Sequence, residues 1–163
     1  MDFDQNEPLK QPLDSQYSQY LTFSLSEEMY GIDIRLVTEI IGLLPITQLP
    51  RVPDFILGIA NLRGKIIPLL DVRLKFGKTQ IPYNSRTCVI VVEIQGITAG
   101  LVVDSVAEVT NIDTQWIISP PEYSHEDQNR YITGIAASGD DIKLLLDCDR
   151  LLNDIEKSVE HQI

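Results

Sequence analysis

Two aspartates, Asp71 and Asp104, have the placement that most directly suggests chemistry, because each directly follows an apolar run. Two carboxylates that share a proton can activate water, so such a pair would act in acid hydrolysis. Enzymes of that kind also carry a glycine shortly after each aspartate, which lets the backbone turn tightly beside the carboxylate. Val72-Arg73 and Ser105-Val106 stand at these places instead. We therefore expect both aspartates to end strands or cap turns, and acid hydrolysis remains an alternative.

The histidines and cysteines are too few and too widely spaced for other common kinds of active site. His125 lies in a polar stretch and His161 near the C-terminus, whereas a Ser-His-Asp or Cys-His arrangement needs a histidine that is oriented by packing. Cys88 and Cys148 are 60 positions apart and lack the paired spacing of zinc ligands. The glycines do not form a phosphate-binding loop. The sequence therefore predicts no catalytic residue, no metal and no cofactor.

Composition places the chain among globular proteins of the cytoplasm. Its 163 residues, 44% hydrophobic and 23% charged, suit one domain with a substantial core. No apolar run approaches the ~20 residues of a membrane-spanning helix, and residues 1–16 lack the apolar region of a signal peptide. Two cysteines without a pairing pattern suit a reducing compartment. A net charge of −11 opposes binding to nucleic acid, so we expect neither that partner nor membrane insertion.

The charge is unevenly distributed along the chain. Residues 51–86 hold seven basic and two acidic side chains, a net charge of +5, whereas the rest of the chain carries −16. Such asymmetry can steer a protein partner toward one part of the surface, and it can equally arise from solvated charges scattered by chance. Charge alone does not decide between these two readings.

Short apolar segments separated by turn residues predict an all-β protein with a few short helices. Nine or ten such strands, with turns at close intervals, are typical of a barrel or a sandwich. The pattern runs twice, with a predicted divide near residues 77–86, and the acidic segment 1–17 is expected to be a flexible leader. The predicted strands cover residues 20–25, 29–32, 55–62, 65–70, 87–94, 97–103, 105–112, 131–137 and 142–146, and a polar loop covers 119–130.

Three helices are predicted between and after these strands. Apolar residues at helical spacing favour a two-turn helix over 34–41, and Asp71 is placed to cap a short helix over 72–76. A terminal helix is expected over 147–159. Its apolar face would consist of Leu151, Leu152 and Ile155.

One pair of opposite charges is a candidate for orienting a binding surface. Arg63 stands with Gly64 at the turn of a predicted hairpin, where little covers its side chain, and Glu39 lies on the predicted helix. Side by side they would form an ion pair. Because 24 positions separate them, spacing alone does not bring them together.

Several motifs spread over residues 18–155 identify a family when they are taken together and in order. They are Tyr30-Gly-Ile-Asp-Ile, Val37-Thr-Glu39-Ile, Phe55-Ile-Leu-Gly-Ile-Ala-Asn-Leu-Arg-Gly64, Ile67-Pro-Leu-Leu-Asp-Val-Arg-Leu-Lys-Phe76, Gly100-Leu-Val-Val-Asp104-Ser-Val-Ala-Glu-Val109 and Tyr131-Ile-Thr-Gly-Ile135. The set closely resembles the CheW family of bacterial chemotaxis coupling proteins. The acidic leader and a polar tail over 156–163 are not part of this resemblance.

The resemblance implies a non-enzymatic adaptor. Its fold would be two five-stranded SH3-like β-barrel lobes that share a hydrophobic core, followed by a C-terminal helix. Its partners would be the cytoplasmic tip of a chemoreceptor and the regulatory domain of the histidine kinase CheA, with the isolated chain a monomer. The kinase would bind apolar patches at the lobe ends. The receptor-binding residues carried over by motif are Val37, Glu39, Gly58, Arg63, Gly100, Val106 and Val109.

The resemblance gives these residues physical roles. The glycines, which lack a Cβ, would let an amphipathic receptor helix approach the backbone closely, and the valines would contact its apolar stripe. Two alternatives remain within the adaptor class. One is the coupling module of a related histidine-kinase pathway. The other is a CheV-type protein, which would need an additional receiver domain for which 163 residues leave no room.

Overall fold

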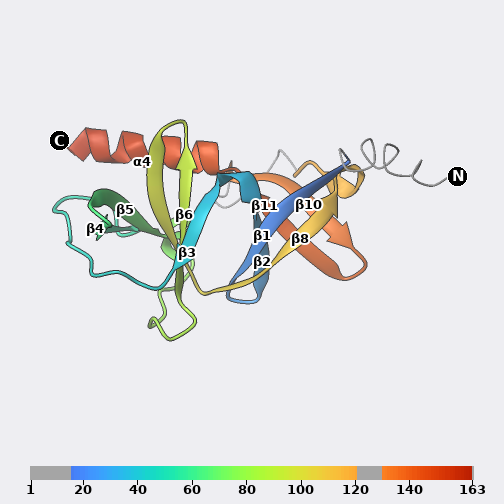
Figure 1. Ribbon diagram of the computed structural model, residues 1–163, viewed down its shortest axis with the longest axis horizontal. Helices are drawn as coiled ribbons and strands as arrows, with labels where there is room; N and C mark the ends of the chain where they lie inside the picture. Colours follow the sequence, from blue (N-terminus) through green and yellow to red (C-terminus); the bar gives the residue numbers. More distant parts are fainter. Residues whose placement is uncertain (1–15, 121–129, 163) are drawn as a thin grey trace, which may run out of the picture.

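The computed structural model describes residues 16–120 and 130–162, and Figure 1 shows them as a ribbon. The strands are β1 (Tyr17–Leu25), β2 (Glu28–Asp33), β3 (Val37–Ile41), β4 (Ile56–Leu62), β5 (Lys65–Asp71), β6 (Cys88–Ile94), β7 (Ile97–Val103), β8 (Ser105–Asp113), β9 (Ile117–Ile118), β10 (Ile132–Ser138) and β11 (Asp141–Leu146). The helices are η1 (Ile34–Leu36), α2 (Val72–Lys75), η2 (Thr114–Trp116) and α4 (Cys148–Gln162).

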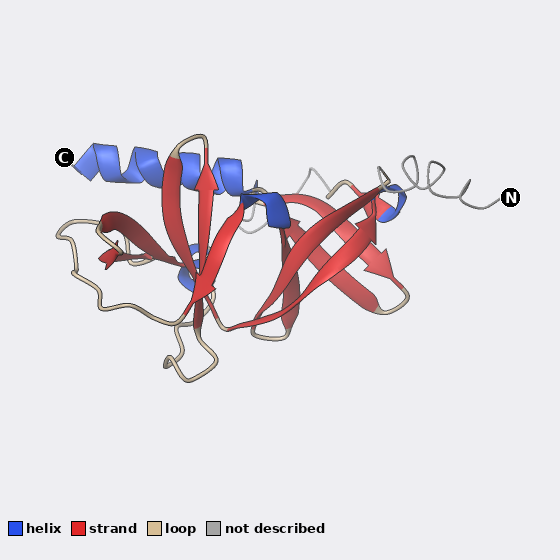
Figure 2. Cartoon of the chain, in the orientation of Figure 1, coloured by secondary structure: helices blue, strands red, loops and turns tan. Residues whose placement is uncertain are grey.

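The strands form two sheets that lie side by side (Figure 2). One sheet has six strands in the order β8-β1-β2-β11-β10-β9, and the other has five in the order β3-β6-β7-β5-β4. We call them the six-stranded lobe and the five-stranded lobe. The predicted all-β class and the two SH3-like lobes are confirmed, but one lobe has an extra strand and the barrel is not closed.

The chain changes lobes at places other than the predicted divide. It enters the five-stranded lobe through η1, between β2 and β3, and leaves it at Asp104, between β7 and β8. Residues 77–86 connect α2 to β6 inside the five-stranded lobe, so the divide predicted there is wrong. The six-stranded lobe is completed by parallel pairing of β2 with β11, which joins segments more than 100 residues apart. A pattern read along the chain contains no information about this pairing.

The helix predicted over 34–41 is wrong. Asp33 accepts a hydrogen bond from the Arg35 backbone N–H and starts the single 3₁₀ turn η1, and β3 follows at once as the antiparallel neighbour of β6. Apolar residues three and four apart suit either structure, but the segment Val37 to Ile41 is rich in β-branched residues. Such residues favour a strand wherever a pairing partner is available, and β6 is that partner.

The predicted turns and caps are largely confirmed. Arg63-Gly64 and Gln95-Gly96 form two-residue turns with positive φ at every position, between 53° and 88°, as tight hairpins require. Asp71 caps α2 by accepting a hydrogen bond from the Leu74 N–H. The terminal helix is present as α4, and because it extends to Gln162, the polar tail predicted from residue 156 is helical. The leader up to residue 15 and most of the loop 119–130 lie outside the described residues, and Tyr17 already belongs to β1.

One hydrophobic core joins the two lobes, as predicted. Four aromatic rings run through it in contact, Phe23 with Tyr30, Tyr30 with Phe76, and Phe76 with Tyr131, with centroids 5.5, 5.6 and 6.1 Å apart. Phe76 directly follows α2, so the five-stranded lobe inserts an aromatic ring between two rings of the six-stranded lobe. The predicted apolar face of α4 packs here too. The core also contains Leu21, Leu25, Ile32, Ile56, Leu70, Val72, Ile90, Val92, Ile94, Ala99, Leu101, Val103, Ile132, Leu146, Cys148, Leu151, Leu152 and Ile155.

The five-stranded lobe has a second core on the opposite face of its sheet. It consists of Ala60, Ile67, Leu69, Val89, Val91 and Val102. Strands β6 and β7 therefore bury both faces, which explains why their sequences are almost continuously apolar.

The two cysteines differ in a way that thiol chemistry can measure. Cys148, 2% exposed, lies in the shared core, and burial raises the pKa of its thiol to about 12, whereas Cys88 is half-buried. Thiolate is the reactive form, so we expect iodoacetamide at pH 8 to modify Cys88 alone in the folded protein and both cysteines in urea. Mass spectrometry of the digested protein distinguishes the sites. Equal modification of Cys148 without urea would contradict this packing.

Candidate partner-binding site

Three of the predicted site residues lie in one row across the five-stranded sheet. Glu39 on β3 pairs with Val91 on β6, which pairs with Gly100 on β7. Gly100 pairs in turn with Leu69 on β5, and Leu69 with Gly58 on β4. Because this sheet ends in β3 on one side and β4 on the other, the row runs from one edge strand to the other.

Glu39 and Arg63 form the predicted ion pair. The Arg63 guanidinium donates two parallel hydrogen bonds to the Glu39 carboxylate, from Nη1 at 2.5 Å and from Nη2 at 2.7 Å. Glu39 lies on edge strand β3 and Arg63 at the end of edge strand β4, so the pair bridges the two edges of the open sheet. The hydrogen bonds from Arg63 lower the pKa of the Glu39 carboxyl group. Arg63 remains 69% exposed, which leaves much of its side chain available to a partner.

Strand β3 of the five-stranded lobe and strand β8 of the six-stranded lobe are edge strands, and each contains a bulge. The bulges set which side chains face the junction between the lobes. An extra residue in β3 places Val37 opposite Val92 and Ile40 opposite Ile90, and both of these partners belong to the shared core. Glu39 pairs with Val91, on the opposite face, so Val37 and Glu39 point to different sides of β3.

A second bulge, in β8, brings the other two valines to a common face. Val106 pairs with Phe23 and Val109 with Leu21, and both of these partners lie in the shared core. Without the extra residue, side chains three positions apart would point to opposite faces. Val106 packs against the shared core, whereas Val109 is 49% exposed.

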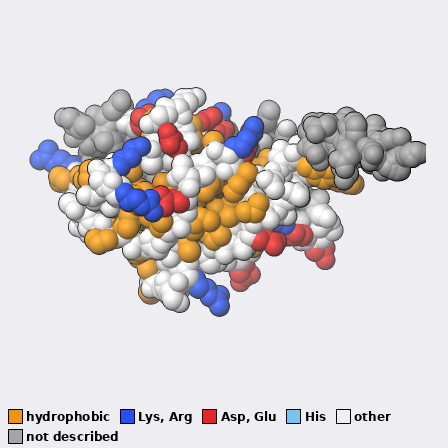
Figure 3. All heavy atoms as spheres, viewed as in Figure 1, with side chains coloured by type: hydrophobic (Ala, Val, Ile, Leu, Met, Phe, Trp, Pro, Cys, Tyr) orange, Lys and Arg blue, Asp and Glu red, His pale blue; other side chains and the backbone are white. Residues whose placement is uncertain are grey.

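The valines and Ile40 form what we call the seam, the apolar edge of the shared core along β3 and β8. On the face drawn in Figure 3, hydrophobic side chains gather over the middle of the molecule, where these strands lie in Figure 1. Ile40 was not among the predicted site residues, and the structure leaves it 43% exposed. In the strand that forms here, the bulge turns Ile40 to the same side as Val37, so we add Ile40 to the candidate residues.

Gly58 and Gly100 do not make room for a partner, although their lack of a Cβ suggested that role. A Cβ on Gly58 would overlap the Thr47 carbonyl oxygen and lie 2.8 Å from Ile46 Cγ2, and its φ of 144° already disfavours a side chain. A Cβ on Gly100 would overlap Leu69 Cδ2 and lie 2.7 Å from Val89 Cγ1. The space beside both glycines is occupied by the protein itself. The close-approach explanation is wrong, and these glycines permit the packing of the row that carries Glu39.

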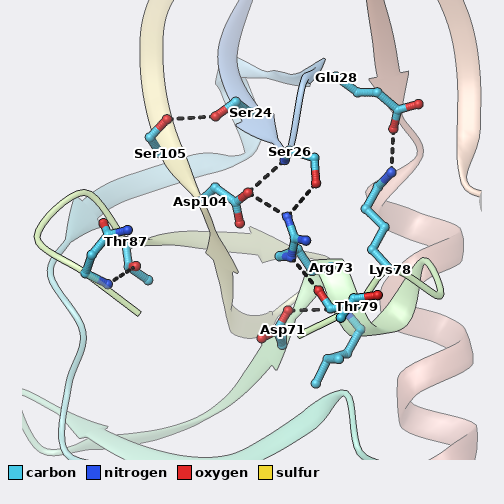
Figure 4. A network of polar contacts seen from close by, with 12 residues as sticks. Ser24, Ser26, Glu28, Asp71, Arg73, Lys78, Thr79, Thr87, Asp104 and Ser105 are labelled. Carbon is cyan, nitrogen blue, oxygen red and sulfur yellow. Dashed lines mark hydrogen bonds and ion pairs between the residues drawn. The ribbon is translucent and has the colours of Figure 1, made fainter. Parts of the chain in front are cut away.

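The aspartates considered for acid hydrolysis contact other residues, and Figure 4 shows both of them, with the contact of Asp104 to Arg73. Asp71 caps α2 with one carboxylate oxygen and accepts a 2.6 Å hydrogen bond from the Tyr83 hydroxyl with the other. Asp104 accepts a hydrogen bond from Arg73 at 2.8 Å. The cavity that they border has a volume of only about 20 Å³. This geometry contradicts a proton-sharing pair and leaves no room for a substrate.

Other catalytic or metal-binding arrangements receive no support from the part of the chain that is described. Within residues 16–120 and 130–162, no three or more His, Cys, Asp and Glu side chains are grouped so that they would hold a metal ion. His125 lies outside these ranges, and the side chain of His161 is not described.

Comparison with known proteins gives the family. The CheW-like domain matches residues 19–156. The chain belongs to the CheW family. The chemotaxis protein CheW of Klebsiella aerogenes is 38% identical over 86% of this chain and 85% of its own length, and that of Helicobacter pylori is 32% identical over 88% and 86%. The crystal structure of the scaffolding protein TtCheW from Thermoanaerobacter tengcongensis superposes with a TM-score of 0.74 at 41% identity, covering 79% of this chain and 88% of that one.

Membership of this family establishes the kind of activity. The chain is an adaptor of chemotaxis signalling and not an enzyme, so its function lies in the surfaces that it presents. None of the helices in the described part of the chain combines the length and apolar character needed to cross a membrane.

Replacing Gly58 by alanine tests the role of the glycine row. Because the new Cβ would meet backbone, we expect Gly58→Ala to lower the free energy of unfolding by about 2–3 kcal/mol in urea denaturation. Gly42→Ala is the matched control, since nothing lies within 4 Å of the added atom and the effect should stay within about 0.5 kcal/mol. Equal effects of the two changes would show that the space at Gly58 is open.

The ion pair predicts a pH-dependent effect of Arg63→Ala. Since the pKa of Glu39 is lowered in the folded state, the stabilisation is fully present above its unfolded pKa near 4.5 and is lost as the pH falls through the folded value. Urea denaturation should therefore show Arg63→Ala less stable than the unmodified chain at pH 7 and equally stable well below pH 4. Arg86→Ala, at an exposed arginine of another loop, should show no such change. A stability difference for Arg63→Ala that persists in acid would exclude this linkage.

Proposed function

We propose that this chain couples the cytoplasmic tip of a chemoreceptor to the regulatory domain of the histidine kinase CheA, in the cytoplasm. The observation that carries the proposal is the Glu39–Arg63 pair on the rim of one lobe, near an apolar seam that runs between the two lobes. The ion pair offers a charged contact and the seam offers an apolar contact. A partner that makes both contacts must match their arrangement.

The receptor is proposed to bind at the seam as an amphipathic helix. Its apolar stripe would contact Val37, Val106, Val109 and Ile40, since a helix presents side chains every three or four residues along one face. Arg63 would contact a polar group at the side of that stripe. An exposed ion pair contributes little to folding, so the interaction fits a role in orienting the partner better than a role in stability. Gly58 and Gly100 would act indirectly, by holding Glu39 in its row.

The kinase is proposed to bind the outer ends of the lobes. The five-stranded lobe exposes Ile66, by 58%, and Leu43. The six-stranded lobe exposes Trp116, Ile118 and Ile142, by 65%, 58% and 54%. Exposed large apolar side chains of this kind mark protein interfaces. With receptor and kinase on separate surfaces, both can bind one isolated copy of the chain, which we expect to be a monomer.

Reconstitution tests the proposal directly. The unmodified chain, mixed with a receptor cytoplasmic fragment and CheA, should elute with both partners as a ternary complex in size-exclusion chromatography. A chain that binds neither partner would refute the proposed function.

A charge placed on the seam should weaken receptor binding selectively. Because Val109 is half-exposed, Val109→Asp should leave the thermal unfolding temperature nearly unchanged, while the dissociation constant for the receptor fragment rises at least about tenfold, equivalent to about 1.4 kcal/mol. Biolayer interferometry measures both partners separately, and CheA binding should not change. Ala107→Asp introduces the same charge at another exposed position of β8 and is the matched control. If the two variants bind receptor equally well, Val109 does not belong to the interface.

A further inference from the structure

Arg73 forms a polar joint between the two lobes. Its guanidinium, in α2 of the five-stranded lobe, donates from Nη1 to Asp104 Oδ2 at 2.8 Å and to Ser26 Oγ at 2.7 Å (Figure 4). Its Nε donates to the Thr79 carbonyl oxygen at 2.9 Å. Ser26 belongs to the β1–β2 turn of the six-stranded lobe, and Asp104 is the residue at which the chain crosses between lobes. The side chain of Arg73 is only 8% exposed, so these contacts are largely removed from water.

The same carboxylate oxygen also holds the turn of the six-stranded lobe. Asp104 Oδ2 accepts a 2.7 Å hydrogen bond from the Ser26 backbone N–H, so Arg73, Asp104 and Ser26 contact one another in a closed triangle. We call this triangle the latch. It joins an element of each lobe to the crossing point between them.

Two further contacts lie around the latch. Lys78, which follows α2, donates to Glu28 Oε1 at 2.7 Å, and Glu28 is the first residue of β2. Ser24 of β1 and Ser105 of β8 share a hydrogen bond of 2.7 Å between their hydroxyl groups. The Lys78–Glu28 contact joins the two lobes, and the Ser24–Ser105 contact holds the start of β8 against β1 beside the latch.

We propose that Arg73 and Asp104 are positioning residues that set the placement of the two lobes relative to each other. The shared hydrophobic core also joins the lobes, but hydrophobic contact is non-directional. The hydrogen bonds of a guanidinium are directional, so they select one orientation among those that the core would permit. Asp104 stands directly before β8 and two residues before Val106. The latch therefore determines where the β8 side of the seam lies relative to the β3 side.

This inference rests on the proposed function for its consequence, because a partner that binds across the seam needs both lobes in register. Each apolar patch proposed for the kinase lies within one lobe, so a CheA molecule that binds one of these patches does not have this requirement. Loss of the latch should therefore weaken receptor binding much more than CheA binding, which a general loss of stability would not do.

The placement of the lobes is tested by double electron–electron resonance, which gives the distribution of distances between two spin labels. Labels are attached at Glu93→Cys in β6 and Thr133→Cys in β10, exposed residues of different lobes, in a background with Cys88→Ser and Cys148→Ala. Asp104→Asn removes the negative charge of the latch and leaves the size of the side chain nearly unchanged. Asp113→Asn makes the same change at the other end of β8, where the carboxylate caps η2 within the six-stranded lobe, and is the matched control.

The proposal expects a broadened or displaced distance distribution for Asp104→Asn and the parent distribution for Asp113→Asn. It also expects at least a tenfold rise in the dissociation constant for the receptor fragment with Asp104→Asn, and less than a twofold change for CheA. Arg73→Lys, which keeps the charge without the planar fork, should show the same direction of change, and it replaces Asp104→Asn if that variant does not fold.

A parent-like distance distribution in the folded latch variant would overturn the proposal, as would equal weakening of both partners. If the unmodified chain binds no receptor fragment, the proposed function fails, and the distance distributions still decide whether the latch positions the lobes.

Discussion

The hydrophobic core shared by the two lobes is the constraint on which the rest of the structure depends. Each sheet is open, and neither lobe buries all its apolar residues alone. Phe76 of the five-stranded lobe lies between the rings of Tyr30 and Tyr131 of the six-stranded lobe, and α4 adds buried side chains to the same core. An adaptor of this design is held together by burial, which leaves its surfaces free to specify partners.

Open sheets leave edge strands, and this protein uses the edges next to the junction of its lobes. Edge strands expose unpaired backbone groups and are a hazard for aggregation, which bulges reduce by twisting the strand. Both β3 and β8 carry a bulge, and each bulge also turns apolar side chains to the seam. The Glu39–Arg63 pair bridges the two edges of the five-stranded lobe. The same bulges thus protect the edges and shape the surface proposed to bind the receptor.

The polar groups inside the protein are used to orient its parts. Asp71 and Arg73 are buried and Asp104 is partly buried, and each has hydrogen-bond partners, which the cost of burying a charged group requires. Two aspartates after apolar strands suggested chemistry, but a capping interaction explains one and the joint between the lobes explains the other. This use of carboxylates suits a family whose members act by placing other proteins.

The sequence by itself determined the all-β class, the tight hairpins, the cap at Asp71, the terminal helix and, through motifs in order, the family and its candidate site residues. These features depend on side-chain type and short-range spacing. Only the tertiary structure decided that residues 37–41 form a strand, that the chain changes lobes at η1 and Asp104, and that Gly58 and Gly100 face their own lobe. Strand pairing, bulges and the packing around a missing Cβ arise between segments distant in the chain, and no local pattern contains them.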